Sequence, residues 1–145
     1  MNSIVYLKKI GKSDLGYLSF FESNRDIPFE IKRVYFTYDV PVNGKRGMHA
    51  HKNLQQVLWC PHGIIEVELD DGETKEAFLL DSPEKALLVG SGIWRDIYWR
   101  MENSILCVAS SDYYNEDDYI RDYNDFKSYL KVGYWKDENK LQSVR

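Results

Sequence analysis

The sequence is poor in the residues that would place it in a specialised protein class. It has two cysteines and four prolines in 145 residues, and Cys60 and Cys107 each stand alone in an apolar stretch. Isolated cysteines outside a CxxC motif indicate buried thiols in a reducing compartment, not a disulfide framework. Residues 1–10 lack the features of a signal peptide, and no apolar run approaches a membrane span. We therefore expect a cytoplasmic protein without membrane association.

The chain also lacks an excess of positive charge, because 23 acidic residues outnumber 19 basic ones and the formal net charge is −4. An acidic chain of this kind is not expected to bind nucleic acid. Residues 30–52 are an exception, since their five basic residues outnumber Glu30 and Asp39; they are Lys32, Arg33, Lys45, Arg46 and Lys52. This basic stretch suits a small anionic ligand such as a phosphate ester, and solvated charges at strand edges explain it equally well. Overall composition is that of an ordinary globular protein, and we expect a single domain over residues 1–145.

Aromatic residues are abundant at 14%, with eleven tyrosines and four tryptophans, and they favour strands and ligand pockets. Short apolar stretches separated by turn residues predict ten strands, at 4–9, 17–22, 31–38, 47–52, 55–60, 63–69, 74–79, 86–89, 93–100 and 104–110. The pair Asp71-Gly72 is typical of a hairpin turn. This spacing predicts an all-β sandwich or barrel. A short terminal helix is expected at 123–131, behind an acidic run at 112–125 that we interpret as a solvated cap.

Two of the three histidines, His49 and His51, are two residues apart. On a strand, alternate side chains point to the same face, so both imidazoles are expected to enter one space. Such a pair serves either a metal site or proton transfer. From the pair alone, a purely structural role in a binding barrel is as good an interpretation as a catalytic one.

The arrangement of this central region resembles the cupin superfamily of double-stranded β-helix (jelly-roll) proteins. Their first motif combines the histidine pair with a glutamate and a glycine, and their second supplies a further histidine. Here Gln56 stands at the glutamate position, followed by Gly63, and Arg95 stands at the position of the third histidine. A guanidinium repels a divalent cation and does not deprotonate to bind one. We therefore expect no metal and no other cofactor, and an interior pocket in which the histidines move protons.

A closer resemblance is to the dTDP-sugar 3,4-ketoisomerases. It is carried by residues 29–41, by Arg-Gly-Met-His-Ala-His-Lys at 46–52, and by residues 78–83 and 111–123. Gly90-Ser91-Gly92 departs from the proline-rich turn expected before the second motif. The resemblance implies a metal-free, usually dimeric cupin that moves the ketone of dTDP-4-keto-6-deoxyglucose from C4 to C3. The dTDP-3-keto-6-deoxyhexose would then serve deoxysugar biosynthesis for a glycan such as lipopolysaccharide or an S-layer.

This reaction needs a base for the C3 proton, a proton relay, and donors for the enediolate oxygen. His49 and His51 are the candidates for base and relay, in either order, and Tyr35 is the candidate hydroxyl donor or acid. Arg33, Arg46 and Arg95 are candidates for binding the diphosphate or the oxyanion. We also expect substrate contacts from Lys52, Gln56 and Trp94, although a core role for Trp94 is the stronger of its two interpretations. His62, next to Pro61 in an expected turn, is excluded from the site.

Three alternatives remain from the sequence. A metal-dependent cupin enzyme is disfavoured by Gln56 and Arg95. A non-catalytic sugar-nucleotide-binding cupin is disfavoured by the histidine pair beside a basic stretch. An epimerase acting on the same sugar nucleotide also begins with proton abstraction next to a carbonyl, so its residues would look alike.

Overall fold

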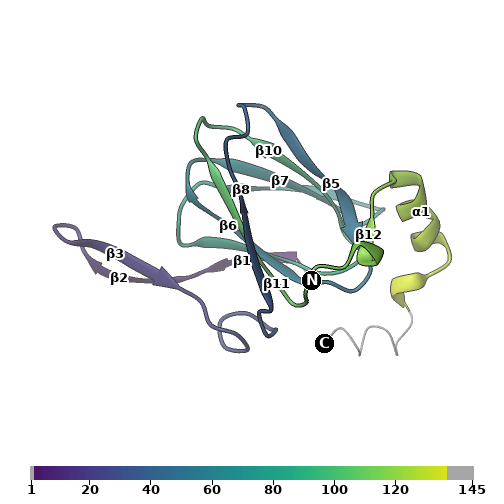
Figure 1. Ribbon diagram of the computed structural model, residues 1–145, viewed down its shortest axis with the longest axis horizontal. Helices are drawn as coiled ribbons and strands as arrows, with labels where there is room; N and C mark the ends of the chain where they lie inside the picture. The colour runs from purple at the N-terminus through teal and green to yellow at the C-terminus, as the bar shows by residue number, and fades with distance from the viewer. Residues whose placement is uncertain (1, 137–145) are drawn as a thin grey trace.

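Two five-stranded antiparallel sheets face each other in the computed structural model, which describes residues 2–136 (Figure 1). One sheet has the order β1-β9-β6-β11-β4, from Asn2–Tyr6, Lys85–Val89, Gln56–His62, Ile105–Ser110 and Arg33–Thr37. The other has the order β12-β5-β10-β7-β8, from Tyr119–Ile120, Lys45–His51, Trp94–Trp99, Ile65–Asp70 and Lys75–Leu80. The prediction of an all-β, cupin-type jelly roll with a short C-terminal helix is confirmed. The predicted single domain also spans residues 1 and 137–145, which lie outside the described residues.

Alternate side chains along the strands point inward and build the core between the sheets. In β7, for example, Ile65, Val67 and Leu69 are buried, while Glu66 and Glu68 between them are less so. The inward side chains of both sheets form one apolar cluster. The predicted hairpin turn joins β7 to β8, and Gly72 there adopts a φ of 95°, which glycine tolerates without strain.

The N-terminal region differs from the prediction of one strand over 4–9. Leu7 is buried and separates β1, which pairs with β9, from β2 (Lys8–Lys12), which pairs only with β3 (Gly16–Phe20). The β2–β3 hairpin projects away from the two sheets (Figure 1). A single apolar stretch did not reveal this division, because the chain changes its pairing partner at Leu7.

The predicted helix is present as α1 (Tyr123–Lys131), with Asp122 as its N-cap. Its buried face carries Phe126, which packs with Ala50, Trp94 and Ile120 on the outside of the second sheet. Two short 3₁₀ turns, η1 (Glu116–Asp118) and η2 (Tyr134–Lys136), flank this region. Within residues 2–136 no helix has the length and apolar character needed to span a membrane.

Candidate active site

Strand β5 carries both histidines into the interior, and a bulge in its pairing with β10 sets the angle of His49. Arg95 pairs with His49 but Asp96 pairs with Gly47, so Met48 is the extra residue. Gly47 and Met48 both have left-handed backbone angles, with φ of 82° and 55°. A Cβ on Gly47 would lie 2.9 Å from the carbonyl oxygen of Arg95, so this position requires glycine. Bulges of this kind redirect side chains next to active sites.

The two imidazoles form the centre of a continuous chain of polar contacts. His49 Nδ1 lies 3.0 Å from the Gly47 carbonyl oxygen, and His49 Nε2 lies 3.1 Å from His51 Nε2. His51 Nδ1 in turn lies 3.0 Å from Oδ2 of Asp118. Burial is the main cause that lowers the pKa of His49 to about 3 and that of His51 to about 4, and Arg95 adds to both shifts. Both imidazoles are therefore neutral near pH 7.

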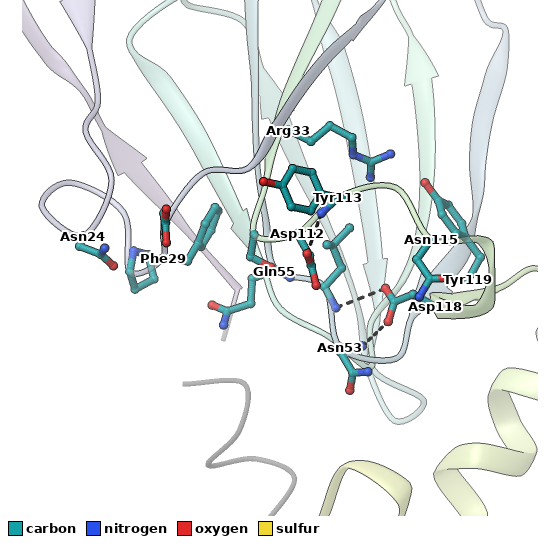
Figure 2. Close-up of a pocket in the computed structure, with 14 residues that line it drawn as sticks. Asn24, Phe29, Arg33, Asn53, Gln55, Asp112, Tyr113, Asn115, Asp118 and Tyr119 are labelled. Atoms are coloured by element: carbon teal, nitrogen blue, oxygen red, sulfur yellow. Dashed lines mark hydrogen bonds between the residues drawn. The ribbon is translucent and has the colours of Figure 1, made fainter.

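Asp118 is a site residue that the sequence analysis missed, because the acidic run was interpreted as a solvated cap. That interpretation is wrong for Asp118, whose side chain is only 12% exposed. Its carboxylate accepts hydrogen bonds from the backbone N–H groups of Asn53 (2.8 Å) and Leu54 (3.3 Å), as Figure 2 shows. Pairing of β12 with β5, which sets Tyr119 opposite His51, brings this carboxylate to the histidines. A two-residue strand leaves no periodic pattern by which to find it.

Arg95 is fully buried beside the histidines and is anchored by Gln56. Its Nη1 donates to Oε1 of Gln56 at 2.6 Å, and its Nη2 donates to the Ile93 carbonyl oxygen at 3.1 Å. Its Nε has no protein partner. Burial lowers the pKa of Arg95 only to about 10, so the guanidinium stays charged at neutral pH. A fixed cation therefore stands where the resemblance places a metal ligand.

Gln56 also links Arg95 to Tyr35. The Gln56 amide donates to Oγ of Ser110 at 3.1 Å and to the Tyr35 hydroxyl oxygen at 3.4 Å. Burial is the main cause that raises the pKa of Tyr35, so its hydroxyl keeps its proton at neutral pH. The interior thus combines two neutral imidazoles, a protonated phenol and a buried cation.

A cavity of about 270 Å³ opens onto Tyr35 and His49, and its lining also includes Arg33, Arg46 and Tyr119 and an apolar wall of Ile97, Trp99 and Leu106. His51, Gln56 and Arg95 are buried and absent from the lining. A second hollow of about 720 Å³ lies beside the cavity and shares Arg33 and Tyr119 with it (Figure 2). Nε and Nη2 of Arg33 are buried and lack a protein partner. The boundary between the two hollows therefore offers unused donors to an anion.

Two of the predicted substrate-binding residues lie away from the cavity. Trp94 precedes the inward-facing Arg95, so alternation sends it to the outer face, where it packs on Phe126 at a centroid distance of 5.8 Å. Lys52 lies beside α1, with its Nζ 5.6 Å from the Tyr129 ring centroid. Trp94 therefore has the core role that was the stronger of its two interpretations, while substrate contact by Trp94 and Lys52 stays a prediction that neither position supports. His62 is exposed at the end of β6 and remote from the site, as expected.

The expectation that no metal is bound depends on which side chains could act as ligands. Among the described residues no three His, Cys, Asp or Glu side chains gather as a metal ion would require. The nearest candidates, His49 and His51, contact each other and Asp118, and they face the charged Arg95.

Comparison with known proteins gives consistent matches along the chain. A family model, FdtA, described as "WxcM-like, C-terminal", matches residues 1–131. A TDP-4-oxo-6-deoxy-α-D-glucose-3,4-oxoisomerase from Aneurinibacillus thermoaerophilus is 44% identical over 129 residues, which are 89% of this chain and 92% of the relative.

Solved structures agree with this match. A variant of the 3,4-ketoisomerase QdtA from Thermoanaerobacterium thermosaccharolyticum, in complex with TDP-4-keto-6-deoxyglucose, is 34% identical with a TM-score of 0.86, covering 90% of this chain and 94% of that one. A 3,4-ketoisomerase from Helicobacter canadensis is 37% identical with a TM-score of 0.86, covering 90% and 97%. A dTDP-4-dehydrorhamnose 3,5-epimerase from Bacillus anthracis, 15% identical with a TM-score of 0.71 over 81% and 76%, shares the fold.

Proposed function

This chain belongs to the FdtA family, and on that premise we propose that it is a sugar-nucleotide 3,4-ketoisomerase acting on dTDP-4-keto-6-deoxyglucose. Its 44% identical relative is named as such an oxoisomerase, and a solved relative holds TDP-4-keto-6-deoxyglucose. The structural observation that carries the proposal is the neutral His49 on the wall of a cavity, beside a fixed cation. The product is a dTDP-3-keto-6-deoxyhexose.

His49 is the base in this proposal, because it lines the cavity whereas His51 is enclosed behind it. The Nε2 lone pair of His49 takes the proton from C3 of the sugar. The electrons of the C3–H bond form the C3=C4 double bond, and the π electrons of the C4 carbonyl move to its oxygen. The C3 hydroxyl proton then moves to the C4 oxygen, and protonated His49 returns its proton to C4, which leaves a ketone at C3 and a hydroxyl at C4.

The negative charge that develops on the enediolate oxygen is stabilised by Tyr35 and Arg95. The Tyr35 hydroxyl is held by Gln56 and retains its proton, so it is available as a donor. Arg95 is absent from the cavity lining, so it acts on the oxyanion through its charge, which its contact with Gln56 holds in place. Prearranged donors in a water-poor site stabilise an oxyanion strongly because they need no reorganisation during the reaction.

The diphosphate is assigned to Arg33 and Arg46. Arg33 stands at the boundary of the two hollows with two unpartnered donors, and Arg46 lies on the cavity lining. Guanidinium groups bind phosphate oxygens through paired hydrogen bonds. Replacing Arg33 by methionine should therefore raise KM more than it lowers kcat in steady-state kinetics.

NMR observation of the purified protein with dTDP-4-keto-6-deoxyglucose tests the function directly. The C4 ketone signal should be replaced by a C3 ketone signal, and the new C4 proton should show the configuration of the product. An epimerase would instead invert a carbon centre and leave the ketone at C4. A binding protein would leave the substrate unchanged. Either of these two outcomes would contradict the isomerase assignment.

We also propose that the chain forms a homodimer in the cytoplasm. Large apolar side chains are exposed on the projecting β2–β3 hairpin and on the outer face of β4, including Leu15 (84%), Leu18 (60%) and Phe36 (61%). Exposed apolar patches of this kind support an interface with a second copy, which light scattering would measure as twice the chain mass. Two free cysteines are compatible with a reducing compartment. The product would then supply deoxysugars for a surface glycan.

A further inference from the structure

We propose that Asp118 is a positioning residue, which holds a proton on Nδ1 of His51 and so leaves a free lone pair on Nε2 of both histidines. This inference rests on the proposed function, because it concerns how the base and its relay are kept ready. It assigns a role to a residue from the acidic run 67 positions after His51.

Two neutral imidazoles carry too few protons to make every contact in this chain a hydrogen bond. Three contacts run in series, from the Gly47 carbonyl oxygen through His49 and His51 to Asp118. Two neutral imidazoles carry only two N–H groups, one each. One of the three contacts must therefore lack a hydrogen.

The groups at the two ends of the chain of contacts determine which contact lacks a hydrogen. The Gly47 carbonyl oxygen and the Asp118 carboxylate are acceptors only, so each must face an N–H group. If His51 carried its proton on Nε2, its Nδ1 lone pair would face a carboxylate at 3.0 Å. If His49 did so, its Nδ1 lone pair would face a carbonyl oxygen at 3.0 Å. Both protons therefore lie on Nδ1, and two lone pairs meet at the Nε2–Nε2 contact of 3.1 Å.

This arrangement is prepared for one additional proton. His49 Nε2 takes the C3 proton from the cavity, and a turn of its ring then directs the new N–H at the Nε2 lone pair of His51, 3.1 Å away. The empty contact becomes a hydrogen bond, and the proton can move to His51, whose Nδ1–H already faces the negative Asp118. The carboxylate thus stabilises the protonated pair more than the neutral pair, which is the condition for accelerating the step.

The position of Asp118 is fixed by the backbone on both sides. Its carboxylate accepts from the N–H groups of Asn53 and Leu54, and its carbonyl oxygen accepts from the N–H group of Lys52 at 2.9 Å. These donors directly follow His51 in the chain. A carboxylate anchored in this way keeps a constant distance to the imidazole it orients.

The cationic groups around the two histidines oppose a protonated imidazole, and the Asp118 carboxylate offsets their effect. Arg95 from β10 and Arg33 from β4 act on His51, and Arg121 from the segment after β12 acts on His49, all in the direction that disfavours a protonated imidazole. Tyr119 packs against both rings, at centroid distances of 5.1 Å and 4.4 Å. Asp118 is the acid whose hydrogen bond and charge favour the protonated form of His51.

The test replaces Asp118 by asparagine, with Asp117→Asn as the matched control. An asparagine that keeps the shorter backbone bond, from Asn53 at 2.8 Å, gives up the longer one from Leu54 and turns its amide N–H₂ toward His51 Nδ1. In this orientation the imidazole carries its proton on Nε2 and donates it to His49 Nε2, which occupies the lone pair of the base. We expect kcat to fall by roughly 10²–10⁴-fold, the range for a misplaced general base, with KM little changed. Asp117 is exposed and one residue away, so its variant should keep both constants.

Nitrogen-15 NMR of the resting enzyme gives a readout that a purely structural role would not move. In the unmodified protein both histidines should carry the proton on Nδ1, and in the Asp118→Asn variant His51 alone should change to Nε2. With only three histidines in the chain, single His→Asn variants assign the signals.

The outcomes separate this inference from the proposed function. An unmodified enzyme with His51 protonated on Nε2 overturns the inference even if the variant does not fold. Retention of wild-type kcat by Asp118→Asn also overturns it, while loss of activity in His49→Asn would leave the isomerase mechanism standing. If the protein has no isomerase activity at all, the proposed function fails, and the tautomer measurement still reports on Asp118.

Discussion

The two ends of the barrel interior are made by the same strands but differ in chemistry. Along β10, the inward side chains run from Arg95 through Ile97 to Trp99. At one end Arg95 stands with the histidines and Gln56. At the other, Trp99 packs with Leu80 and other apolar residues in the main core cluster. Strand β10 therefore contributes to the active site at the end that carries Arg95 and to the apolar core at the end that carries Trp99.

Hydrogen bonding follows the same division. The Trp99 indole N–H donates to the Ser104 carbonyl oxygen at 2.9 Å, so this buried donor of the apolar end is satisfied. At the polar end, Nε of Arg95 and Nε and Nη2 of Arg33 are buried without a protein partner. Unsatisfied buried donors reduce stability, and they persist where a ligand is to supply the acceptor. The polar end thus offers unused donors to a substrate, whereas the apolar end stabilises the protein and contributes only the Trp99 side of the cavity wall.

The largest effect is expected at the polar end from His49→Asn. Loss of the base should lower kcat by roughly 10²–10⁴-fold, because general base catalysis contributes that much. The change is nearly isosteric on the cavity wall, so the free energy of unfolding should change little. Steady-state kinetics with urea denaturation measure both quantities. A variant that retains full activity would remove His49 from the role of base.

At the apolar end, Leu80→Ala should produce the opposite result. Leu80 is fully buried in the core cluster, and removing such a side chain costs about 2–5 kcal/mol of unfolding free energy. Activity per folded molecule should stay close to that of the unmodified protein, since Leu80 contacts none of the proposed catalytic groups. If kcat fell as far as in His49→Asn, the two ends would not be functionally separate.

The third effect is a pH dependence of stability, which arises at the polar end and is confined to acidic pH. Folding lowers the pKa of His49 from 6.5 to about 3 and that of His51 to about 4, so below about pH 6.5 the unfolded chain binds protons that the folded protein does not. Stability should therefore fall as the pH decreases from about 6.5 toward 4, by about 1.4 kcal/mol per pH unit for each histidine.

Urea denaturation of the unmodified protein and of His49→Asn between pH 7 and pH 5 isolates this contribution. Carboxylates elsewhere affect both proteins equally, so the variant should show the shallower dependence. Parallel curves would mean that His49 is not held in its neutral form by the fold.

Local patterns were sufficient to predict most elements of the fold. The period-two alternation of strands such as β7 and the apolar spacing in α1 depend only on near neighbours in the chain, and both elements were found where expected. The division at Leu7 and the outward direction of Trp94 were missed. Each depends on which strand pairs with which, and on which face of the sheet a residue then occupies.

The sequence by itself determined that His49 and His51 share one face, because an HxH pair on any strand must do so. Gln56 and Arg95, at positions where related proteins bind a metal, directed the interpretation toward proton transfer. Only the tertiary structure decided that His49 faces the cavity and that Asp118, 67 residues from His51, completes the chain of contacts. The physical reason is that periodicity orders neighbours along a strand, whereas the meeting of β12 and β5 depends on the closure of the whole fold.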